Sequence, residues 1–286
     1  MKLITLTLRQ HGSLIRRFPL AVILLAIISG TMLWHASGLH EWLQGMGYLL
    51  AVWLSAFVVD LVVNARPRPA TGFPIKRPVR KELLIIFMCE ILATVYLVIH
   101  FSSAGEAMSR NTRMLLLPLM VFVFPIVLAL IYLFRYKYTI RELGINFRYW
   151  WLALIVSAVV GGITIGVAPE KIHWVSAYKE FGIGGWILSG FIGAALSEEF
   201  VRMLFQTRLG AAFGDMGLGL ILASAIWGCM HIPANSQDSH DVTAGLLGAV
   251  DYIPIGVLWG YMTHRTRSII PAVLVHGLNA WGLQNF

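Results

Sequence analysis

Nine long apolar blocks separated by short polar stretches dominate this chain of 286 residues. A helix that spans the hydrocarbon core of a bilayer needs about 20 apolar residues, and several blocks approach that length. Only 13% of the residues are charged, against about 25% in a soluble domain. The sequence therefore predicts an all-α protein, a polytopic transmembrane helix bundle with about eight or nine spanning helices. The blocks cover 18–35, 46–63, 83–100, 114–134, 150–168, 185–207, 216–231, 244–263 and 268–283.

Lysine and arginine are distributed unevenly over the segments between these blocks. Alternate segments carry 17 of these residues on one side and 4 on the other, and cytoplasmic loops are the ones enriched in basic residues. We therefore expect a cytoplasmic N-terminus in an integral protein of the bacterial inner (plasma) membrane. The net charge of +8 follows from this topology and does not indicate a nucleic-acid partner. The seventh and ninth blocks are short, so eight spans remain an alternative.

The stretch 64–81, with four prolines and six basic residues, is the one linker-like segment. We expect an N-terminal transmembrane hairpin and basic loop over 1–82, two further helices over 83–139, and a helix bundle with the polar motifs over 140–286. Trp34-His35-Ala36 offers no small-x-small cleavage site, so the first block is expected to be a retained helix. Cys89 and Cys229 lie in apolar blocks and are expected to be buried and unpaired.

We single out seven ionisable side chains inside the apolar blocks. Each costs roughly 2.5–3.5 kcal/mol at mid-membrane on insertion scales, which makes it a functional candidate. Five of them fall in the sixth, seventh and ninth blocks, whereas Glu90 and Asp251 have no evident role. The seven are Glu90, Glu198, Glu199, Arg202, His231, Asp251 and His276.

The adjacent carboxylates of Glu198 and Glu199 are the strongest of these signals. Two carboxylates side by side in a low dielectric resist ionising together, so the pair can take up a proton near neutral pH, as a general base must. Arg202 shares a helix face with Glu198 at i,i+4 and offsets part of the negative charge. The alternative interpretation is an intrahelical ion pair that only stabilises the bundle, but one glutamate would suffice for that.

Membrane depth indicates which histidines can join this pair. At about 1.5 Å per helical residue, Glu198 lies ~13 Å and His276 ~12 Å from the cytoplasmic end of its block. His231 lies ~22 Å deep on a straight helix, so it fits more loosely. We expect a carboxyl oxygen of Glu198 or Glu199 within about 6 Å of an imidazole nitrogen, with room for one water.

These residues, in this order, resemble the CPBP (ABI) family of CAAX-processing and bacteriocin-processing intramembrane proteases. The family motifs are E-E-x-x-x-R, F-x-x-x-H and H-x-x-x-N/D, each in an apolar helix. The resemblance covers roughly residues 140–286, whereas the first 135 residues show no family mark. The matching segments are Glu198-Glu199 with Arg202, Trp227-Gly-Cys-Met-His231, His276-Gly-Leu-Asn279, Gly256-Val-Leu-Trp-Gly260 and Glu142-Leu-Gly-Ile145.

The first and third motifs depart from the family spacing by one residue each. If Glu198 and Glu199 are the family pair, Arg202 comes one residue early. If Arg202 is in register, Ser197 occupies the position of the first, water-activating glutamate, which would make the chain an inactive relative. Asn279 follows His276 by three residues instead of four, and this spacing still keeps both on one helix face.

The resemblance implies an endopeptidase that hydrolyses a peptide bond without a covalent intermediate. Glu198 would activate a water that His231 helps to hold, Glu199 and Arg202 would orient and tune the base, and His276 and Asn279 would stabilise the oxyanion. No cofactor is expected. Zinc is a less favoured alternative, since H-E-x-x-H is absent and Arg202 would repel a cation. The implied substrate is a membrane protein or a lipidated peptide in the bilayer; the oligomeric state stays open.

Two other functions compete with the peptidase. An inactive membrane scaffold that binds a partner would tolerate the shifted motifs. A secondary transporter or proton relay would use buried ionisable side chains, Glu90 and Asp251 among them. However, transporters are commonly built from internal repeats, and the sequence shows none.

Overall fold

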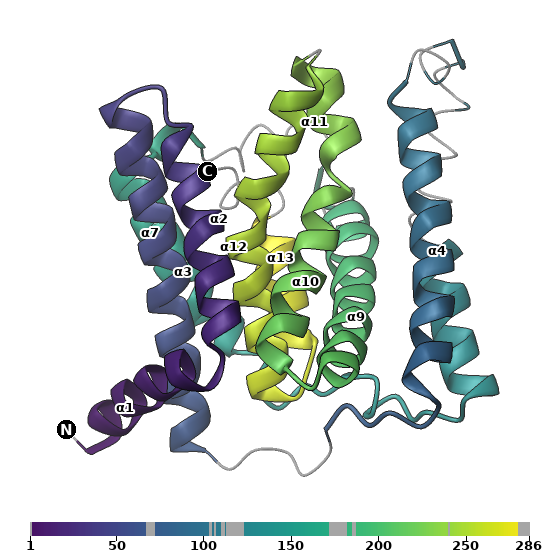
Figure 1. Cartoon of the computed structure of the whole chain (residues 1–286), viewed down its shortest axis with the longest axis horizontal. Helices are drawn as coiled ribbons and strands as arrows, with labels where there is room; N and C mark the ends of the chain where they lie inside the picture. Colours follow the sequence, from purple (N-terminus) through teal and green to yellow (C-terminus); the bar gives the residue numbers. More distant parts are fainter. Residues whose placement is uncertain are drawn as a thin grey trace.

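The computed structural model describes residues 2–66, 72–102, 123–171, 187–239 and 241–279, with the short pieces 105, 107–109, 112 and 182–184. All regular structure in these residues is helical, which confirms the predicted fold class (Figure 1). The helices are α1 (Lys2–Arg17), α2 (Pro19–Trp34), α3 (Leu39–Ala65), α4 (Val79–His100), α7 (Leu152–Val167), α9 (Ser197–Phe213), α10 (Met216–Cys229), α11 (Ile232–Ser239), α12 (Val242–Thr266) and α13 (Ile270–Asn279). Shorter turns are the π-helical η1 (Ile131–Arg135) and η3 (Ile187–Leu196) and the 3-10 helix η2 (Pro169–Lys171).

Four helices among the described residues are long and apolar enough to cross a membrane, or five if the bent pair α1–α2 counts as one span. The four are α3, α4, Met216–Gln237 and α12. Shorter apolar helices cover Val123–Arg135 and Leu152–Val167, in the fourth and fifth blocks. By length and composition these helices are candidate membrane spans, and the count of eight or nine spans remains a prediction.

Three block boundaries differ from expectation. The first block is preceded by α1, which the sequence analysis did not anticipate and which meets α2 at 95°. Pro19 begins α2, where its missing N–H costs no hydrogen bond. The seventh block is not short, because its helix continues through Met216–Gln237. The sixth block extends to Phe213, where Gly214 ends α9 in the left-handed conformation with φ of 67°.

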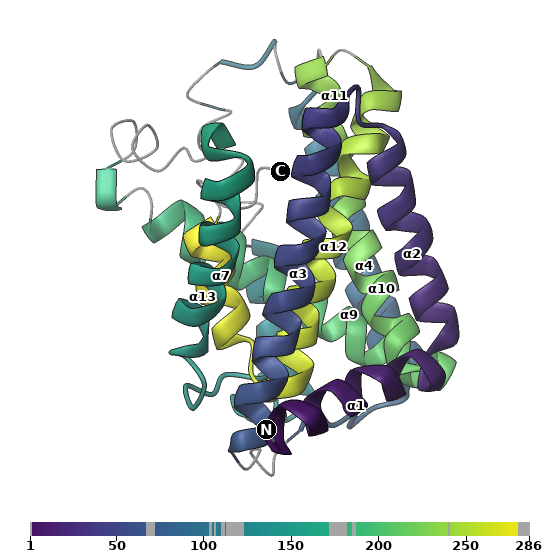
Figure 2. The ribbon, with the colours of Figure 1, turned by 90° about the vertical axis from the view of Figure 1, so that its left-hand side faces the viewer.

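Small residues allow α9, α10 and α12 to pack with their backbones close together, as membrane helices often do. A Cβ atom at Gly219 of α10 would collide with the backbone of Gly210 in α9, and one at Gly228 would lie 2.7 Å from the Ala249 carbonyl oxygen of α12. α13 packs against η3, α7 and α12 and lies beside α7 in the turned view (Figure 2). The helices with the sequence motifs are therefore in direct contact.

α12 contains Pro254 in its interior. The hydroxyl of Tyr48 from α3 bonds to the two backbone groups beside this proline that are not bonded to each other. This hydroxyl donates to the Asp251 carbonyl at 2.8 Å and accepts from the Ile255 N–H at 2.9 Å. These two backbone groups would bond to each other in an uninterrupted helix. A side chain of α3 thus inserts into the α12 ladder, a recognised cause of helix bending.

Two ion pairs outside the motif region are buried. Their arginines follow the ends of the sixth and eighth apolar blocks, in segments that were counted as cytoplasmic loops. Arg208 of α9 lies 2.7 Å from Glu82 at the start of α4. Arg265 of α12 pairs with Asp60 of α3, which also accepts a 2.6 Å bond from the Tyr261 hydroxyl. The expectation of loop positions was wrong for both arginines, because a local carboxylate compensates each charge inside the bundle.

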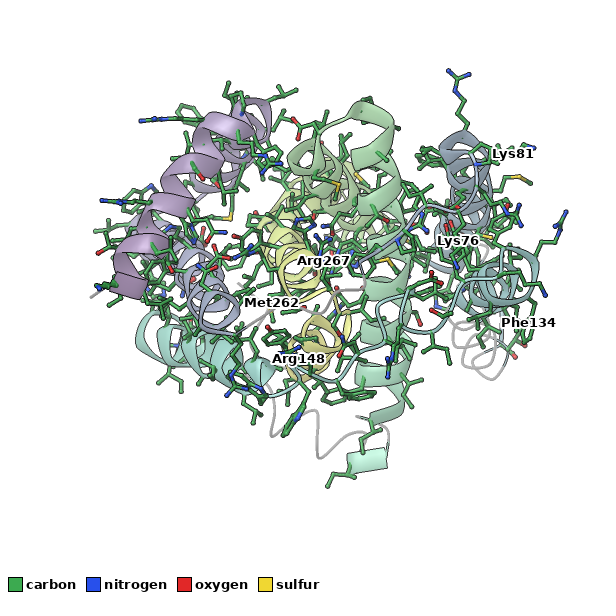
Figure 3. The ribbon with its side chains drawn as sticks, turned by 90° about the horizontal axis from the view of Figure 1, so that it is seen from below. Lys76, Lys81, Phe134, Arg148, Met262 and Arg267 are labelled. Atoms are coloured by element: carbon green, nitrogen blue, oxygen red, sulfur yellow. The ribbon has the colours of Figure 1, made fainter. Side chains whose placement is uncertain are left out.

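Four other basic side chains lie at one end of the bundle. Lys76, Lys81, Arg148 and Arg267 lie around the end seen from below (Figure 3). α1 runs across the same end (Figure 2). This arrangement agrees with the uneven distribution of charge along the sequence, whereas the side of the membrane on which this end lies remains a prediction.

Candidate functional site

The carboxylates of Glu198 and Glu199 project from the first turn of α9, where the π-helical turn η3 passes into regular α-helix. Glu199 is 1% exposed, and its Oε1 is ion-paired with Nη2 of Arg202 in the same helix. The i,i+4 spacing had favoured Glu198 as the neighbour of Arg202. The structure instead pairs Arg202 with Glu199 at i,i+3, which leaves Glu198 free to face a different surface.

Two indole rings enclose the guanidinium of Arg202. Its central carbon lies 4.9 Å from the ring centroid of Trp227 and 5.2 Å from that of Trp259. Among the residues that the structure describes, the Nε and Nη1 atoms have no hydrogen-bond partner, so the electron-rich ring faces supply part of their compensation. This cation is therefore held by Glu199 and two tryptophans within the bundle.

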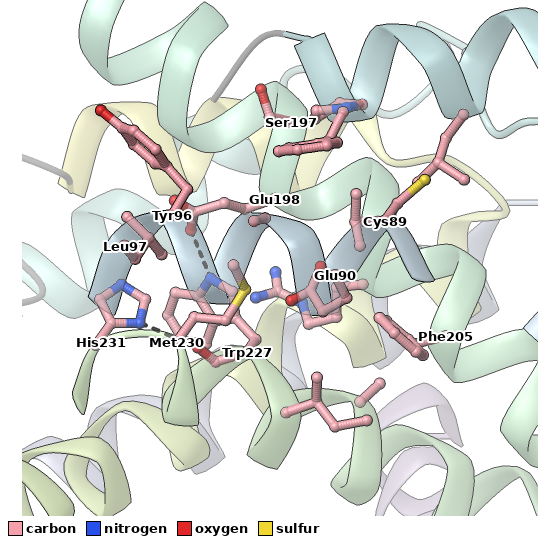
Figure 4. A pocket seen from close by; sticks show the side chains of 18 of the residues that line it. Cys89, Glu90, Tyr96, Leu97, Ser197, Glu198, Phe205, Trp227, Met230 and His231 are labelled. Atoms are coloured by element: carbon pink, nitrogen blue, oxygen red, sulfur yellow. Dashed lines mark hydrogen bonds between the residues drawn. The ribbon is translucent and has the colours of Figure 1, made fainter. Parts of the chain in front are cut away.

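The indole N–H of Trp227 orients the side chain of Glu198. The indole Nε1 donates to Glu198 Oε2 at 2.5 Å, and His276 Nε2 lies 3.7 Å from the same oxygen. The side chain of Glu198 is 28% exposed and lines the cavity drawn in Figure 4. It is thus the carboxylate of the pair that an incoming molecule can reach.

His276 projects from α13 between the two glutamates. Its Nδ1 lies 2.9 Å from Glu199 Oε1, so the imidazole and carboxylate groups meet within the distance expected from the sequence. The ring stacks on Trp259 of α12, with centroids 4.0 Å apart and planes at 18°. Hydrogen bonding and stacking together fix the orientation of this side chain.

His231 lies at the junction of α10 and α11 and lines the same cavity. Its Nδ1 is 3.0 Å from the carbonyl oxygen of Trp227, and its ring stacks on Tyr252 at 4.4 Å. Because a carbonyl oxygen only accepts, Nδ1 carries the hydrogen of the neutral ring and Nε2 keeps the lone pair. His231 therefore borders the cavity with a basic nitrogen available.

The cavity has a volume of about 250 Å³ and lies between α4 on one side and α9 and α10 on the other. Most of its lining is apolar, with contributions from Ala93, Leu97, Val201, Phe205 and Met230. The charged or titratable side chains among the lining residues are Cys89, Glu90, Tyr96, Glu198, Arg202 and His231. A bound hydrophobic peptide segment with a polar group at its centre would be complementary to this lining.

The other candidates from the sequence lie as follows. Glu90 faces the cavity, whereas Asp251 of α12 is not among its lining residues. Asn279 is the last residue of α13, and its side chain lies outside the described part of the structure. Both cysteines are free. Cys89 is half-buried and Cys229 is exposed, so the expectation that both would be buried was wrong: an apolar block leaves one helix face toward lipid.

Sequence reasoning missed the contributions of Trp259 and Tyr252. Trp259 was noted only as a letter in the stretch 256–260, yet it packs on both His276 and Arg202. Tyr252 covers His231. Both lie on α12, and only the packing of α12 against α10 and α13 reveals their role. A tryptophan beside a short motif carries no signal of this kind by itself.

Comparison with known families supports the resemblance found in the motifs. Residues 180–282 match the family model described as type II CAAX prenyl endopeptidase Rce1-like. The match confirms the resemblance for a segment narrower than 140–286, and it leaves out Glu142-Leu-Gly-Ile145. No curated protein and no solved structure matches the chain.

Proposed function

We propose that this protein is an intramembrane endopeptidase in which Glu198 activates a water molecule to hydrolyse a peptide bond. One observation supports this most directly: Glu198 faces the cavity with one carboxylate oxygen held by Trp227 Nε1 at 2.5 Å and His276 at 3.7 Å. The similarity of residues 180–282 to type II CAAX prenyl endopeptidases favours the same chemistry. The substrate would be a membrane protein or a lipidated peptide in the bilayer, in keeping with the apolar cavity.

In this mechanism Glu198 removes a proton from the water as its oxygen attacks the carbonyl carbon of the scissile bond. The Nε2 of His231 helps to hold the water. With both ring nitrogens protonated, His276 donates from Nδ1 to Glu199 and from Nε2 to the oxyanion that forms, an interaction worth about 3–4 kcal/mol per donor in other enzymes. The protonated Glu198 then transfers its proton to the leaving nitrogen as the carbon–nitrogen bond breaks.

Glu199 and Arg202 would act as positioning residues. Glu199 accepts from both Arg202 and His276, so it links the base-bearing helix α9 to α13. The mechanism needs no metal ion. Asn279 is proposed as a second oxyanion donor on the family resemblance alone.

The one-residue motif shift supports a second candidate, a catalytically inactive relative that binds membrane partners. In that alignment Ser197 occupies the position of the base. Ser197 also lines the cavity, beside Glu198. The two alignments therefore assign the position of the base to different side chains on the same wall.

Cleavage of membrane peptides by the purified protein in liposomes tests both candidates. Glu198→Gln keeps size and hydrogen bonding but removes the base, so cleavage should fall by about 10²–10⁴ while folding is kept. Wild-type activity that survives Glu198→Gln would refute this base. An inactive wild type that gains activity on Ser197→Glu would favour the other alignment.

A further inference from the structure

Glu90 is a carboxylate of the cavity that the proposed chemistry does not use. It projects from α4, on the wall opposite α9 and α10, toward the cavity that Glu198 and Trp227 also line (Figure 4). α4 lies outside the matched segment 180–282. The side chain is therefore a feature of the part of this protein that carries no family mark.

Glu90 differs from the other carboxylates around this half of the bundle in lacking a partner. Glu82 pairs with Arg208, Glu199 pairs with Arg202, and Glu198 accepts from Trp227. Within the described residues Glu90 has no hydrogen bond and no ion pair. The charge that acts on it most strongly is that of Glu198, which repels it. An uncompensated carboxylate in a largely apolar membrane cavity is costly.

Arg202 and His231 are the basic side chains among the described residues that line the cavity, and each has its main partner elsewhere. Arg202 is bound to Glu199 and enclosed by Trp227 and Trp259. His231 is hydrogen-bonded to a backbone carbonyl. A cationic group on a molecule that enters the cavity would therefore supply the partner that the described residues do not give Glu90.

The rest of the lining defines the kind of molecule. Around Glu90 the wall is made of apolar side chains such as Ala93, Leu97 and Phe205. Lysine and arginine combine an aliphatic stem with a cationic head, so they can cover an apolar wall and still present a charge. Their head groups form charge-assisted hydrogen bonds with carboxylates, which are stronger than neutral ones.

We propose that Glu90 forms a specificity subsite that binds the cationic head of a lysine or arginine close to the scissile bond of the substrate. This inference rests on the proposed peptidase function and adds a substrate class to it: apolar membrane peptides with a single basic residue beside the cleavage site. The α4 wall selects the substrate, while the α9 and α10 wall carries out the reaction.

Matched peptides test the subsite with the full-length protein in liposomes. Apolar peptides of about 20 residues carry one lysine at successive positions, and each has a twin with norleucine, which keeps the stem without the charge. For wild type, kcat/KM should be about 10- to 100-fold higher for the lysine peptide at one position next to the cleavage site, as expected for a hydrogen bond to a charged group. Glu90→Gln should bring that ratio close to one.

Two further variants act as controls. Cys89→Ser alters the adjacent lining residue without a change of charge, so the lysine preference should persist. Glu90→Lys should reverse the preference toward a peptide with glutamate at that position. If Glu90→Gln fails to fold, two measurements still test the subsite. These are the wild-type ratio of kcat/KM between lysine and norleucine peptides, and the reversed preference of Glu90→Lys.

The outcomes separate this inference from the function on which it rests. A wild type that cleaves none of the peptides, basic or apolar, contradicts the peptidase proposal itself. Equal cleavage of lysine and norleucine twins at every position leaves the peptidase intact and overturns the subsite. A Glu90→Gln variant that is slower on both twins, with the ratio kept, also overturns the subsite, because Glu90 would then act on the reaction and not on selection.

Discussion

The imidazole of His276 lies flat against the indole of Trp259, with ring centroids 4.0 Å apart and planes at 18°. Trp259 is fully buried in α12, and it also lies over the guanidinium of Arg202. One residue of α12 thus sets the positions of a histidine on α13 and an arginine on α9. The geometry around Glu198 depends on α12 even though no proposed catalytic group lies on that helix.

Replacing Trp259 should therefore impair the reaction more than substrate binding. In Trp259→Leu the imidazole of His276 loses its flat support, and a displacement of about 1 Å in such a group can cost roughly 10²-fold in rate. We expect kcat to fall about 10- to 100-fold with little change in KM. Trp259→Phe retains an aromatic face and should lose less. Equal kcat for the leucine variant and wild type would contradict the positioning role.

Substitutions of Glu198 and Glu199 should differ in their effects: one should mainly reduce activity and the other should mainly reduce stability. Glu199→Gln leaves Arg202 without its buried partner, and breaking such a pair typically costs about 3–5 kcal/mol. Glu198→Gln removes a partly exposed carboxylate without an arginine partner, so thermal unfolding in detergent should change little. Activity should fall further in Glu198→Gln than in Glu199→Gln.

Glu82→Gln provides the matched control for this comparison. It breaks the buried pair with Arg208, and Glu82 does not line the cavity. This variant should be destabilised about as much as Glu199→Gln while its folded fraction keeps wild-type activity. A destabilised Glu198→Gln beside a stable Glu199→Gln would contradict the assignment of the two roles.

Tyr48→Phe should destabilise α12 at Pro254. Without the hydroxyl, the Asp251 carbonyl and the Ile255 N–H lose the group that bridges them. A buried polar group left without a partner costs about 1–3 kcal/mol. We expect a lower melting temperature and faster hydrogen exchange near Ile255. Unchanged exchange at that amide would show that the helix recloses its own hydrogen bond.

Chelators should leave activity unchanged, because the proposed chemistry uses a carboxylate base and imidazole donors. In the described ranges, no three His, Cys, Asp or Glu side chains are grouped to hold a metal ion. The Arg202 cation bound to Glu199 would also repel one. Cleavage is measured before and after EDTA or 1,10-phenanthroline. Activity that is lost with chelator and restored by zinc would rule out a metal-free site.

The sequence predicted the helical class and the meeting of the Glu198–Glu199 pair with His276. The length of an apolar block and the depth of a residue within it can both be read from the block itself. The sequence did not predict α1, whose 16 residues mix leucines with four basic side chains and form no long apolar block. It also assigned Arg208 and Arg265 to loops. Whether an arginine ends in water or in a buried pair depends on a carboxylate from another helix, and Glu82 and Asp60 lie far away along the chain.

The sequence also could not decide which of the two glutamates pairs with Arg202. Spacings of i,i+3 and i,i+4 both bring side chains together on a helix, so the pattern alone does not decide between Glu199 and Glu198. Packing against Trp227 and Trp259 decides it. The aromatic groups that orient the site come from α10 and α12, and their roles appear only once the helices are assembled.

The orientation of the bundle gives the last prediction. Lys76 and Lys81 lie at the basic end of the bundle (Figure 3), and membrane proteins retain such residues on the cytoplasmic side. In a Cys89→Ser, Cys229→Ser background, Lys76→Cys and Lys81→Cys should react with an impermeant maleimide only in inside-out vesicles. Ser37→Cys, in the connection between α2 and α3, should react only in intact spheroplasts. The reverse pattern would invert the topology and place the basic end outside the cell.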